Sequence, residues 1–143
     1  MTSTPLHGGC LCGAVRYTLA EPPALAEYCH CSMCRKAHGG AFSVNAVVPA
    51  ATLVIVQGED ALSEFASSTR RRKRFCARCG SQLFIRRTDN DAIVVVTLGS
   101  LDDAAAIPAP ARHVFVDSKA PWHELAGELP RYRVYPGFEP ADD

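Results

Sequence analysis

Residues 29–34 carry the greatest density of reactive groups in this sequence, because they read Cys-His-Cys-Ser-Met-Cys. Zn²⁺ takes thiolate and imidazole ligands in a tetrahedral array, so three thiols leave one position for water or substrate. An open position distinguishes a catalytic zinc from a structural one. If Cys29 and Cys31 lie on an extended segment, their side chains share one face, and a tight turn returns Cys34 to the same centre. The spacing therefore predicts an open zinc site with Cys29, Cys31 and Cys34 as ligands.

Two further cysteine pairs have the spacing of zinc half-sites. Cys10 and Cys12 lie between glycines, and an extended segment there would present both thiols on one face. Cys76 and Cys79 form a CxxC knuckle followed by a glycine, in which two thiolates grip one metal across a tight turn. A redox CxxC pair expects a βαβ context, whereas a strand-turn-strand pattern follows here.

The seven cysteines divide as two, three and two along the chain. This division predicts two zinc ions, one closed by the two distant pairs and one left open on the three-thiol cluster. Other pairings stay open on spacing alone, and a Cys₄ iron site is also chemically accessible. Buried free thiols and a disulfide framework are the competing structural readings. The odd cysteine count and an N-terminus without a charged and an apolar signal segment favour a reduced, cytoplasmic protein.

Length and charge narrow the classes of partner. A chain of 143 residues predicts one domain, 1–143, with a substantial core. Lysine plus arginine equals aspartate plus glutamate, 15 against 15, which gives no indication of nucleic acid or an anionic membrane. No apolar run approaches the roughly 20 residues of a membrane span. The one basic run, residues 70–74, is interpreted as a solvated edge strand, since no aromatic residues alternate with its charges.

Short strands separated by turn residues dominate the predicted structure. A short helix is expected from Ser32, as its cap, to Gly39, and one helical turn over 102–106. A hairpin is expected to join the strands at 42–48 and 53–57. The predicted strands are 14–19, 42–48, 53–57, 62–67, 82–87, 92–98, 112–116 and 131–135. We therefore expect a mainly β protein of packed short antiparallel sheets with little helix.

With these motifs in order, the chain resembles the glutathione-dependent formaldehyde-activating enzymes, whose domain is shared with centromere protein V. The motifs that carry the resemblance are Gly-Cys-Leu-Cys-Gly at 9–13, Cys-His-Cys-Ser-Met-Cys-Arg-Lys at 29–36, Phe-Cys-Ala-Arg-Cys-Gly-Ser at 75–81 and Asp-Ser-Lys-Ala-Pro-Trp at 117–122. The resemblance implies an Mss4-like, mostly β fold.

The resemblance also implies roles for the cysteines. It assigns a structural zinc to Cys10, Cys12, Cys76 and Cys79, and a catalytic zinc to the three-thiol cluster. The implied activity is addition of the glutathione thiol to formaldehyde, which gives S-hydroxymethylglutathione and is classed as a carbon–sulfur lyase by its reverse direction.

The remaining polar residues near the cluster have two readings each. Arg35 and Lys36 either hold a substrate carboxylate or are solvated cations. His30 and His38 are expected to be structural. The expected partners are a small thiol such as glutathione and an aldehyde, with neither membrane nor nucleic acid. The competing functions are a zinc-stabilised module that binds nucleic acid or protein through residues 70–74, and a metal-storage or redox-sensing protein.

Overall fold

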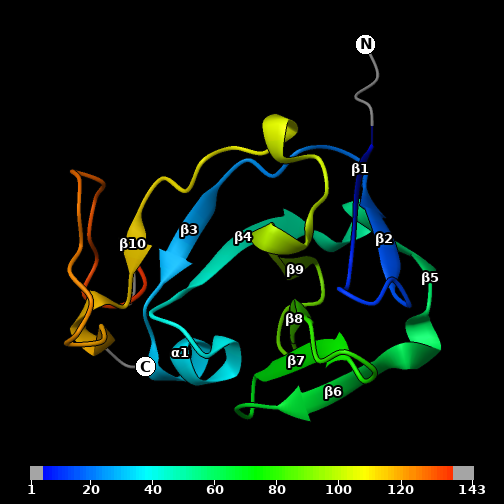
Figure 1. Ribbon diagram of the computed structural model, residues 1–143, viewed down its shortest axis with the longest axis horizontal. Coiled ribbons are helices and arrows are strands. Elements are labelled where there is room, and N and C mark those ends of the chain that lie inside the picture. The colour runs from blue at the N-terminus through cyan, green and yellow to red at the C-terminus, as the bar shows by residue number, and fades with distance from the viewer. Residues whose placement is uncertain (1–4, 137–143) are drawn as a thin grey trace.

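The computed structural model describes residues 5–136 as two β-sheets and one short α-helix (Figure 1). The three-stranded sheet has the order β1 (Leu6–Gly9), β2 (Arg16–Leu19) and β5 (Leu53–Gln57). The seven-stranded sheet has the order β10 (His113–Val114), β3 (Ala26–Cys29), β4 (Ser43–Pro49), β9 (Ile93–Thr97), β8 (Gln82–Arg87), β7 (Arg71–Cys76) and β6 (Leu62–Ala66). The helix α1 spans Ser32–His38. The prediction of a mainly β protein is confirmed.

Within residues 5–136, five 3₁₀ turns lie between or after these elements, at Ala50–Thr52, Glu59–Ala61, Leu98–Ser100, Ala104–Ala106 and Val116–Ser118. Every strand pairing in the two sheets is antiparallel except that of β10 with β3, which is parallel. None of the helices within residues 5–136 has the length and apolar character needed to cross a bilayer.

The core forms where the small sheet packs on the large one. Val15, just before β2, and Tyr17 and Leu19 within it occupy alternate positions and are all fully buried, as their period of two predicts. The Tyr17 ring meets the Phe84 ring of β8 edge-on, with centroids 5.0 Å apart. The Tyr17 hydroxyl is satisfied by the Ser100 hydroxyl at 2.6 Å, so burial leaves no polar group unpaired there.

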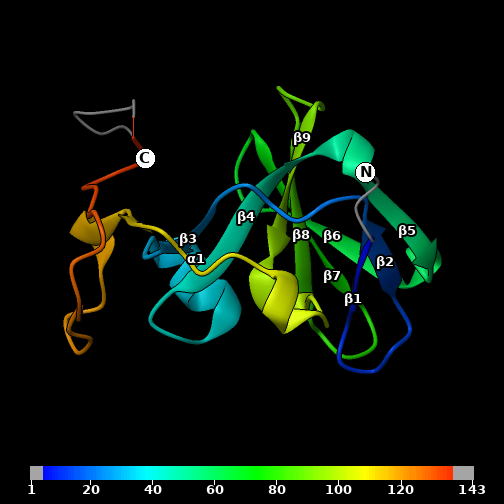
Figure 2. The same cartoon turned by 90° about the horizontal axis from the view of Figure 1, so that it is seen from above.

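The predicted hairpin between 42–48 and 53–57 is wrong. Strands β4 and β5 belong to different sheets, and the 3₁₀ turn at Ala50–Thr52 carries the chain from one to the other (Figure 2). β4 pairs with β3 and β9, while β5 pairs with β2. A Pro-containing connection of this length allows either route, and burial of the apolar faces of both sheets decides between them.

The basic run, residues 70–74, does not form an edge strand, so the interpretation from the sequence is wrong on this point. β7 lies between β6 and β8, and β6 forms the edge. Arg74 faces Glu64 of β6 at 3.7 Å, and Arg86 of β8 binds the same carboxylate at 2.9 Å. Lys73 points to the opposite face and is only 7% exposed. Cross-strand ion pairs therefore accommodate part of this charge within the sheet.

Two predicted boundaries also differ. Cys31, not Ser32, caps α1, because its Sγ accepts a hydrogen bond from the backbone N–H of Cys34 at 3.3 Å. Gly39 ends the helix at φ 63°, as predicted.

The segment 131–135 is not a strand, although it runs beside β10: the N–H of Tyr132 donates to the carbonyl of His113 at 2.9 Å. Figure 1 shows this C-terminal segment (orange) against β10.

Candidate functional site

Four cysteines from the two distant pairs converge in the structure. The thiols of Cys10, Cys12, Cys76 and Cys79 all lie within 4.8 Å of one another. The turn after β1 brings the first pair together, with the N–H of Gly13 donating to the carbonyl of Cys10, so the expected extended geometry of this pair is wrong. Cys76 ends β7 and Cys79 lies in the turn that follows, where Gly80 takes φ 79°. We call these residues the four-cysteine cluster.

The sulfur separations in this cluster match a tetrahedral metal. The Cys10 and Cys12 sulfurs are 3.6 Å apart, and those of Cys12 and Cys76 are 3.7 Å apart. A Zn–S bond of ~2.3 Å places tetrahedral sulfurs about 3.8 Å from one another. Polar contacts also support sulfur as an anionic ligand: the N–H of Val15 donates to Cys10 Sγ at 3.2 Å, and the Ser81 hydroxyl lies 3.2 Å from Cys79 Sγ.

Three further thiols form a separate group at the end of β3. The sulfurs of Cys29, Cys31 and Cys34 lie within 4.8 Å of one another, and those of Cys29 and Cys34 are 3.5 Å apart. Cys29 ends β3, Cys31 caps α1 in an extended conformation, and the first helical turn returns Cys34, as the spacing predicted. We call these residues the three-cysteine cluster. Among the described residues, no fourth Cys, His, Asp or Glu ligand atom joins this group.

The three thiols of this cluster differ in pKa because their hydrogen bonds differ. Hydrogen bonds from Cys29 and Cys34 lower the pKa of Cys31 well below that of a free thiol, and the charge of Lys73 lowers it further. Hydrogen bonds to Cys31 and Cys34, together with burial, raise the pKa of Cys29. Cys31 is also the partly exposed member, whereas Cys29 and Cys34 are buried. Cys31 is therefore the thiol whose anionic form is most favoured, and the cluster is accessible on its side.

Aromatic and imidazole groups line the back of the cluster. His30 is fully buried, and its Nε2 lies 2.9 Å from Nδ1 of His113. Burial lowers the pKa of His30 to about 4, with the charge of His113 adding to the effect, so the pair stays neutral near neutral pH. Val114 and Phe115 pack on the buried thiols. His30 therefore has a packing role, and it is separate from the thiol group.

The two predicted substrate contacts lie in different surroundings. The Arg35 Nε donates to the Ser118 carbonyl at 3.1 Å, which ties α1 to the 3₁₀ turn Val116–Ser118. Lys36 is exposed and lines a pocket beside α1. Lys73 lines the same pocket and was missed by the sequence interpretation, which treated residues 70–74 as one solvated run. Its alternation with Arg72 and Arg74 along β7 was the available signal.

Comparison with known proteins identifies the family of this chain. The family model of the glutathione-dependent formaldehyde-activating enzymes matches residues 5–118, a range that contains both clusters. The chain belongs to this family. A Halomonas elongata protein provisionally named as a glutathione-dependent formaldehyde-activating enzyme is 32% identical over 127 residues, with 84% of this chain and 80% of that protein covered.

A solved structure of this fold was also found. The crystal structure of a Rhodobacter sphaeroides protein superposes with a TM-score of 0.57 and 28% sequence identity, covering 67% of this chain and 87% of that chain. The predicted resemblance to the glutathione-dependent formaldehyde-activating family is thereby confirmed, and the cysteines lie on the part of the chain that carries it.

Proposed function

We propose that this member of the glutathione-dependent formaldehyde-activating family, folded as a single domain over residues 1–143, adds a glutathione thiol to formaldehyde in a zinc-dependent reaction. The product is S-hydroxymethylglutathione, and the reverse reaction is that of a carbon–sulfur lyase. The S–H bond breaks, a C–S bond forms, and the carbonyl oxygen gains a proton, so the reaction is redox-neutral. The observation that carries the proposal is a three-thiol group without a fourth protein ligand atom in the described residues.

The two clusters fit different zinc roles. The four-cysteine cluster supplies a complete tetrahedral ligand set with sulfur separations of 3.6 to 3.7 Å, which suits a closed structural ion. The three-cysteine cluster would hold the second ion with one position free. Zinc bound there would offer that position to a thiol and would favour its deprotonated form at neutral pH. Zinc is preferred over iron because a redox-silent metal suits both a structural clip and a redox-neutral reaction.

The chain's own residues then orient the reactants. Cys31 lies on the accessible side of the cluster, and the N–H of Cys34 donates a hydrogen bond to its sulfur at 3.3 Å. Arg35 fixes α1 to Ser118 and so keeps Cys34 in register with Cys29. Lys36 is exposed on the same helix and lines the neighbouring pocket, where it would contact the substrate. Both metal sites need reduced cysteines, and all seven cysteines are free thiols, which supports a cytoplasmic location for the protein.

A non-enzymatic module that binds nucleic acid is the competing function. It requires residues 70–74 to present a continuous basic surface. In the structure Arg74 faces Glu64 and Lys73 is buried, so the run is divided between two faces of the sheet. This arrangement favours the enzyme.

Exchange NMR of glutathione and formaldehyde at equilibrium with S-hydroxymethylglutathione tests the function. The zinc-loaded protein should accelerate exchange above the spontaneous rate, and Cys31→Ser should remove the acceleration. An unchanged exchange rate with fully loaded protein would refute the enzyme, whatever the protein binds.

A further inference from the structure

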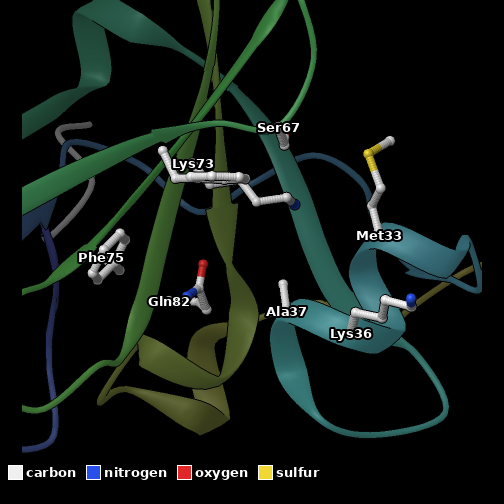
Figure 3. Close-up of a pocket in the computed structure, with 8 residues that line it drawn as sticks. Met33, Lys36, Ala37, Ser67, Lys73, Phe75 and Gln82 are labelled. Carbon is white, nitrogen blue, oxygen red and sulfur yellow. The ribbon is translucent and has the colours of Figure 1, made fainter.

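A pocket of about 430 Å³ lies between α1 and the β6–β8 part of the large sheet (Figure 3). Met33 and Lys36 of α1 form one wall, and Lys73 and Phe75 of β7 with Gln82 of β8 form the other. Pockets of this size hold small organic ligands, which usually need an apolar lining with a few polar groups. This pocket has that composition.

The charge of the pocket has one sign. Lys36 and Lys73 contribute two ammonium groups, and none of the residues that line it is acidic. Lys73 is 7% exposed, and within residues 5–136 its ammonium forms no hydrogen bond or ion pair. Figure 3 shows its side chain reaching across the pocket toward α1. Because no described carboxylate pairs with this ammonium, it is available to an anion from outside the chain.

A second unsatisfied group lies in the same wall. The Ser67 hydroxyl is buried and has no hydrogen-bond partner in the described part of the chain. Together with the amide of Gln82 it can donate a hydrogen bond to an anionic oxygen. Two cations and two neutral donors are the chemistry that carboxylate groups require.

The pocket adjoins the three-cysteine cluster. The helix that supplies Met33 and Lys36 also carries Cys34 and begins at its cap, Cys31. Cys31 is the partly exposed member of the cluster, at the start of the same helix. A ligand with its sulfur at that side would extend its remaining atoms along α1 into the pocket.

We propose that this pocket binds the carboxylate groups of the thiol substrate, with the ammonium groups of Lys36 and Lys73 as the specificity-determining contacts. The inference rests on the proposed function for its thiol, and it defines the substrate class as a small peptide-like thiol with free carboxylates. Met33 and Phe75 pack against the methylene groups of such a ligand. Arg35 is left out, because its Nε is bound to Ser118.

Calorimetric titration with S-methylglutathione isolates the pocket, because this probe has the carboxylates but no thiol. The zinc-loaded protein should bind it, and Lys36→Gln and Lys73→Gln should each weaken binding about tenfold, the effect of losing one charge-assisted hydrogen bond. The diethyl ester of the probe should bind at least about tenfold more weakly than the diacid. Arg72→Gln is the matched control: Arg72 lies on the opposite face of β7, where its guanidinium bonds the Ser68 carbonyl, and binding should be unchanged.

The outcomes separate the two proposals. A second measurement replaces zinc with cobalt and follows the absorption spectrum as glutathione is added. If the diacid binds in a Lys73-dependent way but glutathione leaves the cobalt spectrum unchanged, the pocket is supported and the thiol site is refuted. The pocket proposal would be overturned if glutathione changes the cobalt spectrum but binds with the same affinity as its diester, and if neither lysine variant weakens binding. If Lys73→Gln fails to fold, the Lys36→Gln variant, at an exposed position, and the comparison of diacid with diester test the pocket instead.

Discussion

Cys12 and Cys76 are separated by 64 positions in the chain, and their sulfur atoms lie 3.7 Å apart. This contact joins the turn after β1, in the small sheet, to the end of β7, in the large sheet. A metal held here closes a long loop and connects the two sheets through a single centre. The four-cysteine cluster is therefore expected to support the whole fold.

Replacing Cys76 with serine should remove folded protein. A closed Cys₄ site contributes metal-linked folding free energy, several kcal/mol of which is lost when one ligand is removed. Circular dichroism and elemental analysis of purified protein would test this, with two zinc ions per chain expected in the unmodified protein. One zinc or iron per chain would contradict the two-site assignment.

Cys31→Ser is the matched variant in the other cluster. The three ligands of this cluster lie within six residues, so losing the metal there opens no long loop. The variant should lose one zinc, and its free energy of unfolding should stay within about 1 kcal/mol of the unmodified protein. A collapse of stability equal to that of Cys76→Ser would show that the three-cysteine cluster is structural.

Tyr17 predicts alkaline sensitivity. Burial raises its pKa to about 12, so above pH 10 the unfolded chain releases a proton that the folded chain retains. Unfolding then releases protons, and the free energy of unfolding should fall by about 2 to 3 kcal/mol between pH 10 and 12. Urea titrations should show this slope disappearing in Tyr17→Phe and persisting in Tyr28→Phe. An equal slope in both variants would refute the assignment.

Gly8 sits against the Tyr17 ring, and a Cβ there would overlap that ring and lie 2.7 Å from the Ser100 carbonyl oxygen. Gly8→Ala should therefore cost about 1 to 3 kcal/mol by overpacking. Gly40→Ala is the control, since a Cβ at Gly40 meets no atom within 4 Å. Thermal denaturation of the two variants side by side measures the difference, and equal midpoints would contradict the packing described here.

Neutralising Arg71 and Arg72 together, with Lys73 kept, should leave thiol binding unchanged. Neither arginine lines the pocket. Fluorescence anisotropy with a labelled DNA duplex at two salt concentrations provides the discriminating measurement. Salt-dependent DNA binding that vanishes in the double variant would favour the binding-module function.

The sequence predicted what local spacing determines and missed what depends on the tertiary fold. The grouping of Cys29, Cys31 and Cys34 follows from a strand end and one helical turn, both of which are local. The hairpin after β4 was wrong because the pattern of alternating side chains defines a strand but not the sheet it joins.

Lys73 was misassigned for a similar reason. Charge alone favours exposure, whereas the strand register placed this residue on the buried face of β7. The run at 131–135 has the alternation of a strand, but it meets β10 through an isolated bridge only. Side-chain periodicity does not report whether a backbone finds a continuous partner.

Titration of the cobalt-substituted protein with glutathione tests the open site most directly. A thiolate that enters the free position of the three-cysteine cluster should add a charge-transfer band, which the Cys31→Ser protein should lack. The band should saturate at one thiol per chain. If neither glutathione nor any other small thiol changes the cobalt spectrum, the three-cysteine cluster has no open position and the account of this protein as a thiol-activating enzyme is wrong.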